Sequence, residues 1–239
     1  MKTTQRIPRS LGLLPSTILF LLLATSGIES NAQENSTARF IDLSLIVDRD
    51  YPCTWADGFP TFRMDPYLRV GPRSPYNSEI LTIDGNTGTQ MDVPPHSVAR
   101  PELKLPHSGK FGNEFTDQTP AWKFVGQACV VDCRQLLNTT PNGQSSLIQI
   151  SHLQAWETAH RSFRYGDVVL LLSDYSDKYY QPFPAGRRFI ADPLEKKAPG
   201  WPDPHPDAME YLCRRQVFHI GTDSPSMGPI PDLAEPTHY

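Results

Sequence analysis

The chain has 239 residues, of which 38% are hydrophobic and 20% charged, and its formal net charge is -4. These values are typical of a globular protein and exclude a disordered or coiled-coil chain. No run of Lys or Arg follows the N-terminus, so nothing indicates a nucleic-acid partner. Pro is more frequent than Gly, at 24 residues against 15, and we therefore expect long ordered loops on a compact core.

Residues 1–32 have the order of a secretory signal peptide. Three basic residues precede an apolar stretch, Leu11–Ala24, and small and polar residues follow up to Ala32. The apolar stretch is shorter than the roughly 20 residues that a spanning helix needs. We therefore expect cleavage after Ala32, no membrane anchor after cleavage, and a single secreted or extracellular domain over residues 33–239.

The first elements of this domain are a strand and a long loop. Phe40–Val47 alternates mostly with period two, which predicts a strand at a sheet edge. Residues 51–75 are rich in prolines and in aromatic residues such as Trp55 and Phe59. They predict a loop that covers an apolar surface or packs on a partner, although simple core filling fits equally well.

Strands and helices then alternate. Gly126–Asp132 and Gly166–Leu172 are continuous apolar runs, the pattern of strands buried on both faces. Between them, Ser151 and Gln154 have the spacing of a capping box at a helix start. A second helix begins near Pro206. The alternation predicts an α/β or mixed α+β core.

Three details complete this prediction. His152 and His160 fall outside the apolar stripe of the first helix, so both are expected to be solvated. The second helix is expected to bury its apolar side chains, and a strand follows it. The side chains expected to be buried are those of Met209, Leu212 and Cys213. The strand is expected over Val217–Ile220.

The four cysteines would meet an oxidising compartment after export, and they could pair in three ways. They are Cys53, Cys129, Cys133 and Cys213. No Cys-x-x-Cys spacing occurs, so a structural zinc site is not expected.

One segment, Asn86–His96, has the residue types of a site. If the segment is extended, one face of it contains Asn86, Gly88, Gln90, Asp92 and His96. Two prolines stop any strand before His96, which would place the imidazole at the mouth of a loop. The alternative interpretation is a polar turn with a lone histidine.

This segment resembles the signature His-x-Gly-Thr-His-x-Asp-x-Pro-x-His of the cyclase family, which includes bacterial kynurenine formamidase and isatin hydrolase. The matching residues are Gly88, Thr89, Asp92, Pro94 and His96. Further similarity covers residues 39–45, 165–172 and 221–226, and the tail after residue 223 is most similar to the isatin hydrolase branch.

The resemblance implies a single-domain swivelling β/α/β fold with a mixed sheet or barrel-like core flanked by helices. It also implies metal-dependent hydrolysis of a C–N bond in a small aromatic amide, formamide or lactam, with manganese or zinc as the cofactor, and a homo-oligomer. His96 and Asp92 would be catalytic. The expected substrate-binding residues are Asn86, Thr89, Gln90, Trp55 and Phe59.

The chain departs from the family at its metal ligands. Asn86 and Gln90 stand where the family has histidines, and an amide is a weak ligand for zinc or manganese. Asp92 and His238 remain as ligands, while the family's last ligand, a glutamate, would lie beyond Tyr239. We therefore expect a gene product that lacks the closing strand of the family fold. We also expect either a weakened metal site or no metal site.

Two alternatives to a metal hydrolase stay open. In one, His96 oriented by Asp92 is a general base, with Asn86 and Gln90 as donors to an oxyanion, which suits a lyase, isomerase or cyclase. In the other, the chain is a non-catalytic secreted binding protein. A serine hydrolase or a dinucleotide enzyme is excluded because neither Gly-x-Ser-x-Gly nor Gly-x-Gly-x-x-Gly occurs.

Overall fold

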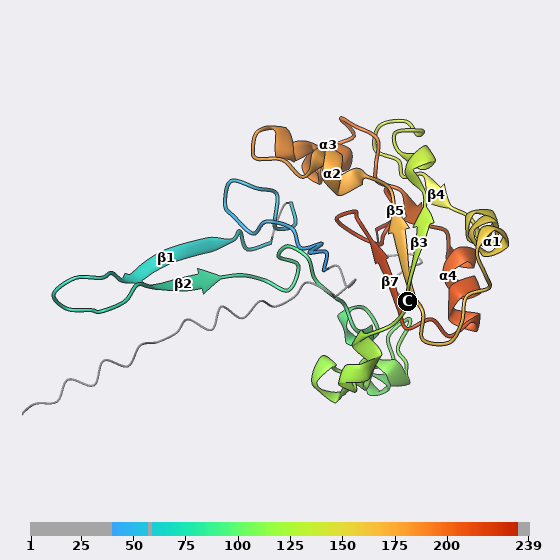
Figure 1. Ribbon diagram of the computed structural model, residues 1–239, viewed down its shortest axis with the longest axis horizontal. Helices are drawn as coiled ribbons and strands as arrows, with labels where there is room; N and C mark the ends of the chain where they lie inside the picture. The colour runs from blue at the N-terminus through green and yellow to red at the C-terminus, as the bar shows by residue number, and fades with distance from the viewer. Residues whose placement is uncertain (1–39, 57–58, 234–239) are drawn as a thin grey trace, which may run out of the picture. The chain divides into compact units, whose positions relative to one another are not determined.

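The computed structural model describes residues 40–56 and 59–233 (Figure 1). The chain divides into two compact units, Met1–Asp42 and Leu43–Tyr239, and every element named below belongs to the second unit. The predicted signal peptide lies outside the described residues. Among the described residues, no helix has the length and apolar character needed to cross a membrane.

Strands, α-helices and short 3-10 helices follow one another along the second unit. The strands are β1 (Arg63–Leu68), β2 (Ser78–Thr82), β3 (Ala128–Asp132), β4 (Leu147–Ile148), β5 (Val168–Leu172), β6 (Asp203–Pro204) and β7 (His219–Thr222). The α-helices are α1 (Ile150–Ala159), α2 (Tyr175–Tyr179), α3 (Ala191–Leu194) and α4 (Pro206–Arg214). The 3-10 helices are η1 (Pro94–His96), η2 (Pro101–Leu103), η3 (Lys110–Asn113), η4 (Thr116–Gln118), η5 (Ala121–Phe124), η6 (Arg134–Leu136) and η7 (Ala185–Arg188). Parallel and antiparallel sheets flanked by helices confirm the predicted mixed α/β class.

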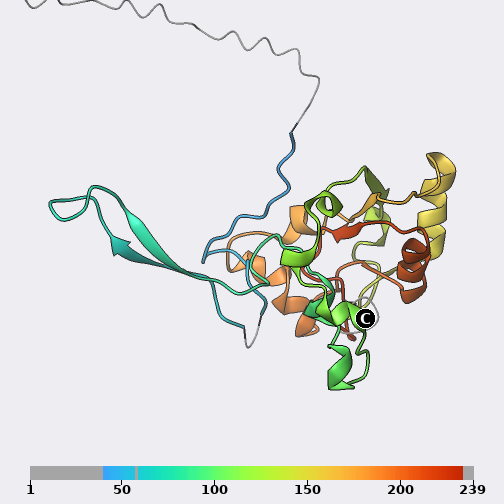
Figure 2. The same ribbon diagram turned by 90° about the horizontal axis from the view of Figure 1, so that it is seen from below.

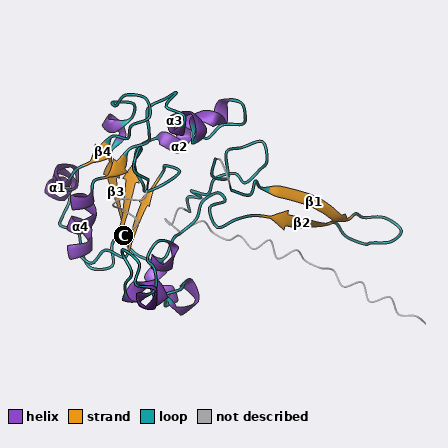
Figure 3. Ribbon diagram, turned by 180° about the vertical axis from the view of Figure 1, so that it is seen from behind, coloured by secondary structure: helices purple, strands orange, loops and turns teal. Residues whose placement is uncertain are grey.

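A parallel three-stranded sheet in the order β3-β5-β7 carries the first core. Val131 and Leu171 are paired in register, and their buried side chains lie in one cluster with Leu153 of α1 and Leu212 of α4. Figure 3 shows α1 and α4 beside this sheet. The two helices therefore supply the apolar cover that a parallel sheet needs on one face.

The other face of β3 is open among the described residues. Burial alternates along β3, and Val130 is 49% exposed. The prediction that this strand is buried on both faces is therefore wrong. A continuous apolar run does not reveal that a strand lies at the end of the strand order, as β3 does.

The predicted helix after residue 150 is confirmed as α1, but its predicted cap is wrong. The helix begins at Ile150, so Ser151 already lies inside the first turn. The N-cap is Gln149, whose backbone N–H donates to Nδ1 of His152 at 2.9 Å. His152 is consequently a half-buried capping residue, while His160 is exposed as predicted.

The second predicted helix is confirmed as α4, which begins at Pro206. Its buried residues are Ala208 and Leu212, whereas Cys213 is exposed and Met209 half-buried. The prediction that Cys213 faces the core is therefore wrong, because the helix turns its Ala208 face inward. The following strand, β7, begins two residues later than predicted.

The N-terminal part of the second unit differs most from the prediction. Phe40–Val47 forms no strand. Within this segment, the backbone N–H of Leu45 donates to a threonine hydroxyl, and the carbonyl of Ile46 accepts from the Tyr180 hydroxyl. The backbone groups of this segment thus bond to side chains and not to the backbone of a neighbouring strand. The predicted loop over residues 51–75 contains β1, which pairs with β2 in an antiparallel hairpin.

A second buried cluster lies beyond the carboxyl end of the sheet. Tyr175 and Trp201 are completely buried in it. The carboxylate of Asp223, just after β7, accepts from the Ser173 backbone N–H at 3.0 Å, the Ser173 hydroxyl at 2.6 Å and the Tyr175 N–H at 3.1 Å. These bonds hold the segment after β5 against the segment after β7.

All four cysteines are free thiols, three of them buried and Cys213 exposed. None of the three possible pairings forms. The stability of the unit therefore depends on packing and hydrogen bonds.

Asp203 in β6 is a buried carboxyl group without a hydrogen-bond partner for either oxygen among the described residues. Its backbone N–H donates to the Ser146 carbonyl at 3.0 Å, which fixes the side chain inside. Burial holds the pKa of Asp203 well above its ordinary value.

We expect Asp203→Asn to stabilise the protein at neutral pH. The unfolded chain releases this proton near pH 4 and the folded chain retains it, so the stabilising contribution is complete below pH 4 and is lost as the pH rises. The advantage of the variant in free energy of unfolding should grow by about 1.4 kcal/mol per pH unit until the folded carboxyl ionises. Denaturant titrations of both proteins at several values between about pH 3.5 and pH 8 measure this difference in free energy of unfolding.

Asp177→Asn, at an exposed position of α2, is the matched control and should show no such trend. Parallel pH profiles for wild type and Asp203→Asn would contradict the prediction.

Candidate functional site

The segment Asn86–His96 is a bent loop and contains no strand. It follows β2, turns at residues 85–89 and ends in η1. The shared face expected of an extended segment is therefore absent. The functional side chains are instead positioned by two hydrogen bonds near the bend.

Gly88 makes the first of these bonds. Its backbone N–H donates to the carbonyl of Cys53 at 2.7 Å, and its φ of +67° lies in the left-handed region that favours glycine. A Cβ atom here would lie 2.7 Å from Cγ2 of Val47. Thr89 makes the second bond, since its hydroxyl accepts from the Leu45 N–H at 2.9 Å. The loop is thereby attached to residues 45–53.

The two amides that replace the family's histidines are held within the loop. Nε2 of Gln90 lies 3.3 Å from Oδ1 of Asn86. With the amide turned over, its nitrogen donates to the backbone carbonyls of Asn86 and Gly85 at 3.1 Å each, an orientation we prefer because it satisfies the donor twice. The Asn86 N–H donates to Asp84 at 2.6 Å. These hydrogen bonds hold the two amides in place within the loop.

Asp92 and His96 lie near each other at the end of the loop. Oδ1 of Asp92 lies 3.7 Å from Nδ1 of His96, and both side chains are accessible to solvent. This distance allows an ion pair and exceeds a direct hydrogen bond. The structure therefore brings these two predicted site residues together, and their roles stay a prediction.

A metal site of the family type does not fit the described residues. They contain no group of three or more His, Cys, Asp and Glu side chains that could hold an ion. Asn86 and Gln90 offer amide oxygens, which are poor donors for zinc or manganese. The remaining predicted ligand, His238, lies outside the described residues.

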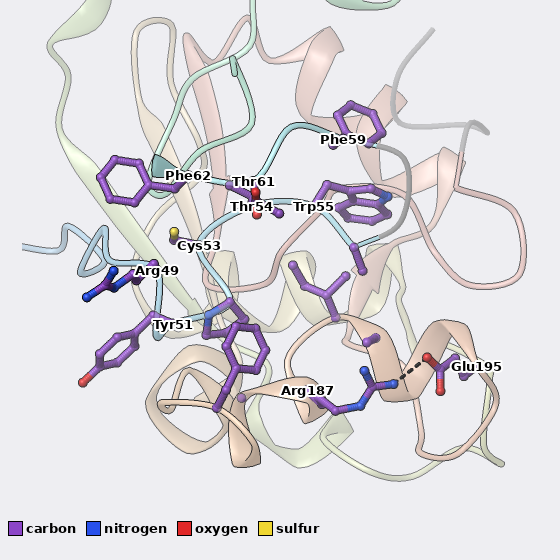
Figure 4. A pocket seen from close by; sticks show the side chains of 16 residues that line it. Arg49, Tyr51, Cys53, Thr54, Trp55, Phe59, Thr61, Phe62, Arg187 and Glu195 are labelled. Carbon is purple, nitrogen blue, oxygen red and sulfur yellow. Dashed lines mark hydrogen bonds and ion pairs between the residues drawn. The ribbon is translucent and has the colours of Figure 1, made fainter. Parts of the chain in front are cut away.

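A pocket of about 380 Å³ lies on the other side of the Gly88 contact, and Figure 4 shows its lining. The aromatic side chains Trp55, Phe59 and Phe62 form much of the wall, and the first two are residues for which substrate binding is predicted. Cys53 also lines it, and burial raises the pKa of its thiol, so the sulfur remains protonated and donates to the Asp48 carbonyl at 3.2 Å.

Another part of the pocket wall comes from residues more than 120 positions later in the chain. Arg187 and Glu195 line it and form an ion pair at 2.5 Å (Figure 4). Phe183 and Ile190 add apolar surface. No motif marks these residues, and only the packing of the second cluster brings them to the pocket.

The predicted site residues therefore fall into two groups. Trp55 and Phe59 line the pocket. The loop residues do not line it: Asn86, Thr89, Gln90, Asp92 and His96. The bond between Gly88 and Cys53 joins the two groups.

Comparison with known proteins agrees with this fold. Residues 41–229 match the sequence profile of the Cyclase family, and the chain belongs to that family. Isatin hydrolase of Roseibium aggregatum is 25% identical over 172 residues, which are 70% of this chain and 58% of that protein. The chain thus spans less than two thirds of this relative.

Solved structures show the same fold. An isatin hydrolase bound to the product analogue thioisatinate superposes with a TM-score of 0.64 and 17% identity over 83% of this chain and 73% of that one. Isatin hydrolase A from Labrenzia aggregata, bound to benzyl benzoate, superposes with a TM-score of 0.61 and is 24% identical in sequence. The match covers 84% of this chain and 72% of that one.

We expect Gly88→Ala to disrupt the attachment of the loop. An alanine would have to adopt the positive φ of this position, and its Cβ atom would collide with Val47. The free energy of unfolding should therefore fall by about 1–3 kcal/mol. Denaturant unfolding measures it. Gly85→Ala is the control, because its Cβ would meet no atom within 4 Å. Equal effects of the two substitutions would contradict the role assigned to Gly88.

Proposed function

We propose that the protein hydrolyses a C–N bond in a small aromatic amide, formamide or lactam. The observation that carries the proposal is the Asp92–His96 pair, which lies in a loop bonded through Gly88 to Cys53 in an aromatic pocket. Relatives that are isatin hydrolases support an aromatic substrate. The benzyl benzoate bound by one of them supports a pocket suited to aromatic rings.

His96 would be the general base of this reaction. It takes a proton from water while the oxygen attacks the substrate carbonyl, and it returns that proton to the departing nitrogen. A carboxylic acid and an amine result, which together account for the amide and the water. Asp92 orients the imidazole and stabilises its protonated form. No step in this scheme depends on a metal.

Asn86 is suited to stabilise the charge that develops on the carbonyl oxygen. Its Nδ2 group donates no hydrogen bond among the described residues, although its backbone N–H and its backbone carbonyl are engaged. An amide N–H aimed at an oxyanion is worth about 3–4 kcal/mol in enzymes that use one. Gln90, which is held by backbone carbonyls, would support the loop and not the substrate.

A second candidate function is metal-independent proton transfer, as in a lyase, an isomerase or a cyclase. The donor set favours it, because the described residues offer an acid–base pair but no third ligand for a family-type ion. Proton transfer needs a placed base and an oxyanion donor, whereas amide cleavage must also expel a poor leaving group.

We also propose that the protein acts after export and as a homo-oligomer, as the signal-peptide pattern and the family resemblance imply. The substrate class would then be met in the secretory pathway or outside the cell.

Removal of the imidazole should abolish most of the activity. We expect His96→Ala to lower kcat by about 10²–10⁴-fold, the usual contribution of general acid–base catalysis, and Asp92→Asn to have a smaller effect. Steady-state assays on a panel of aryl formamides, anilides and isatin-type lactams measure it. His160→Ala, at the exposed C-cap of α1, is the control. Unchanged turnover of His96→Ala would sink the proposal, and binding without turnover by wild type would leave a binding protein.

Restoring the family's two histidines should restore metal binding. We expect Asn86→His/Gln90→His to retain zinc or manganese after dialysis, because two imidazoles join Asp92 as ligands. Elemental analysis of the purified secreted protein measures the metal content. Each single substitution is a control and should bind less. Stoichiometric metal in the wild type, without a gain in the double variant, would show that other residues complete the site.

A further inference from the structure

Two arginines line the aromatic pocket, and only one of them is held in place by other side chains. The side chain of Arg49 makes no hydrogen bond or ion pair with the residues that the structure describes. Arg187, in contrast, is bound by two acidic side chains. Figure 4 shows Arg49 beside Tyr51 and Arg187 beside Glu195. A ligand that reaches Arg187 therefore meets a donor that is already oriented, which lowers the entropic cost of binding.

The two acidic side chains occupy one edge of the Arg187 guanidinium. Nη2 donates to Oε1 of Glu195 at 2.5 Å, and Nε lies 3.4 Å from Oδ1 of Asp192. Nη1 has no partner within residues 40–56 and 59–233. Because a guanidinium presents its N–H donors in a planar fork, holding one edge leaves the N–H groups of Nη1 available to a ligand.

The backbone around Arg187 is attached to the first part of the pocket wall. The N–H of Phe183 donates to the Asp50 carbonyl at 2.7 Å. Gly186 lies so close to Pro52 that a Cβ atom would be 2.9 Å from Cδ of the proline. Figure 2 shows the orange segment with η7 and α3 beside the blue segment that contains these partners. The place of Arg187 in the wall is therefore fixed by the backbone as well as by its ion pairs.

The surface near Arg187 is mainly apolar. Phe183 and Ile190 line the pocket from the same part of the chain, and Trp55 belongs to the same wall. Such a surface can pack against an aromatic ring, but it cannot compensate a polar substituent that loses its water. Ligand pockets of this kind use a few placed polar groups to fix the orientation of the ligand. Nη1 of Arg187 is suited to be such a group.

The charges around the guanidinium favour a neutral acceptor over an anionic one. Lys197 also pairs with Glu195, so the formal charges of Arg187, Lys197, Asp192 and Glu195 cancel. The Lys197 ammonium and the Arg187 guanidinium hold the pKa of Glu195 below its ordinary value, which keeps this carboxylate ionised. A carboxylate on the ligand would be a third negative group beside one guanidinium, and juxtaposed like charges oppose binding.

We propose that Arg187 determines substrate specificity by donating a hydrogen bond from Nη1 to a neutral acceptor, such as a carbonyl or ether oxygen, on the aromatic substrate. This inference rests on the proposed function, within which it defines a narrower substrate class. Asp92 and His96 do not line the pocket. The acceptor that Arg187 binds is therefore a second group of the substrate and not the carbonyl that is attacked.

Binding of three small probes to the purified full chain tests this inference without reference to catalysis. The probes are acetophenone, α-methylstyrene, in which a CH2 group replaces the carbonyl oxygen, and benzoate. None of them contains a C–N bond. By NMR titration we expect the wild type to bind acetophenone about tenfold more tightly than α-methylstyrene, the lower range for a hydrogen bond to a charged group. Benzoate should bind more weakly than acetophenone.

Two variants locate the source of this preference. Arg187→Met removes the donor and keeps an apolar stem, so the two neutral probes should bind equally. Lys197→Met is the matched control, because it removes a cation from the same ion-pair network at a residue that does not line the pocket. It should keep the preference.

Four results would overturn the inference. They are equal binding of the neutral probes by the wild type, tighter binding of benzoate than of acetophenone, a preference that persists in Arg187→Met, and binding of none of the probes. The wild-type results hold even if a variant fails to fold. A preference for acetophenone in a protein that cleaves no amide, formamide or lactam would support the inference and sink the proposed hydrolysis.

Discussion

The hydrogen bond from the Gly88 N–H to the Cys53 carbonyl is the contact on which the organisation of the site depends. It joins the loop that contains Asp92 and His96 to a segment that lines a pocket. The bond requires a backbone conformation that favours glycine, and Val47 occupies the space that any side chain would need. One residue therefore decides whether the two halves of the site belong together.

The loop around Gly88 is held in place by hydrogen bonds of its own residues. A pair of histidine ligands would depend on an ion to hold them in place, whereas Asn86 and Gln90 bond to each other or to nearby carbonyls. Both amides are therefore held by hydrogen bonds within the loop. Asp92 and His96 remain accessible and close together. Such a loop keeps general acid–base chemistry available while its affinity for transition metals declines.

The sequence revealed what depends on local pattern and missed what depends on packing. Apolar runs located β3 and β5, and the family signature located His96 and Asp92. The sequence could not predict that one face of β3 is open, because this follows from the position of β3 at the end of the strand order. Arg187 was missed because no local signal marks a residue that reaches the pocket through the second buried cluster. Strand β1 of the hairpin was missed because it lies within an aromatic, proline-rich segment whose composition indicates a loop.

The distance of 3.7 Å between Asp92 and His96 has a structural cause. The loop is attached at Gly88 and Thr89, and η1 fixes the backbone again from Pro94. Shortening of the pair toward hydrogen-bond distance therefore comes from rotation of the two accessible side chains or from the backbone of the few residues between these points. Catalytic hydrogen bonds are often long in the free enzyme and tighten when a substrate binds. A ligand that fills the pocket and contacts the loop could supply that change, and Gly88 is the point through which it would be transmitted.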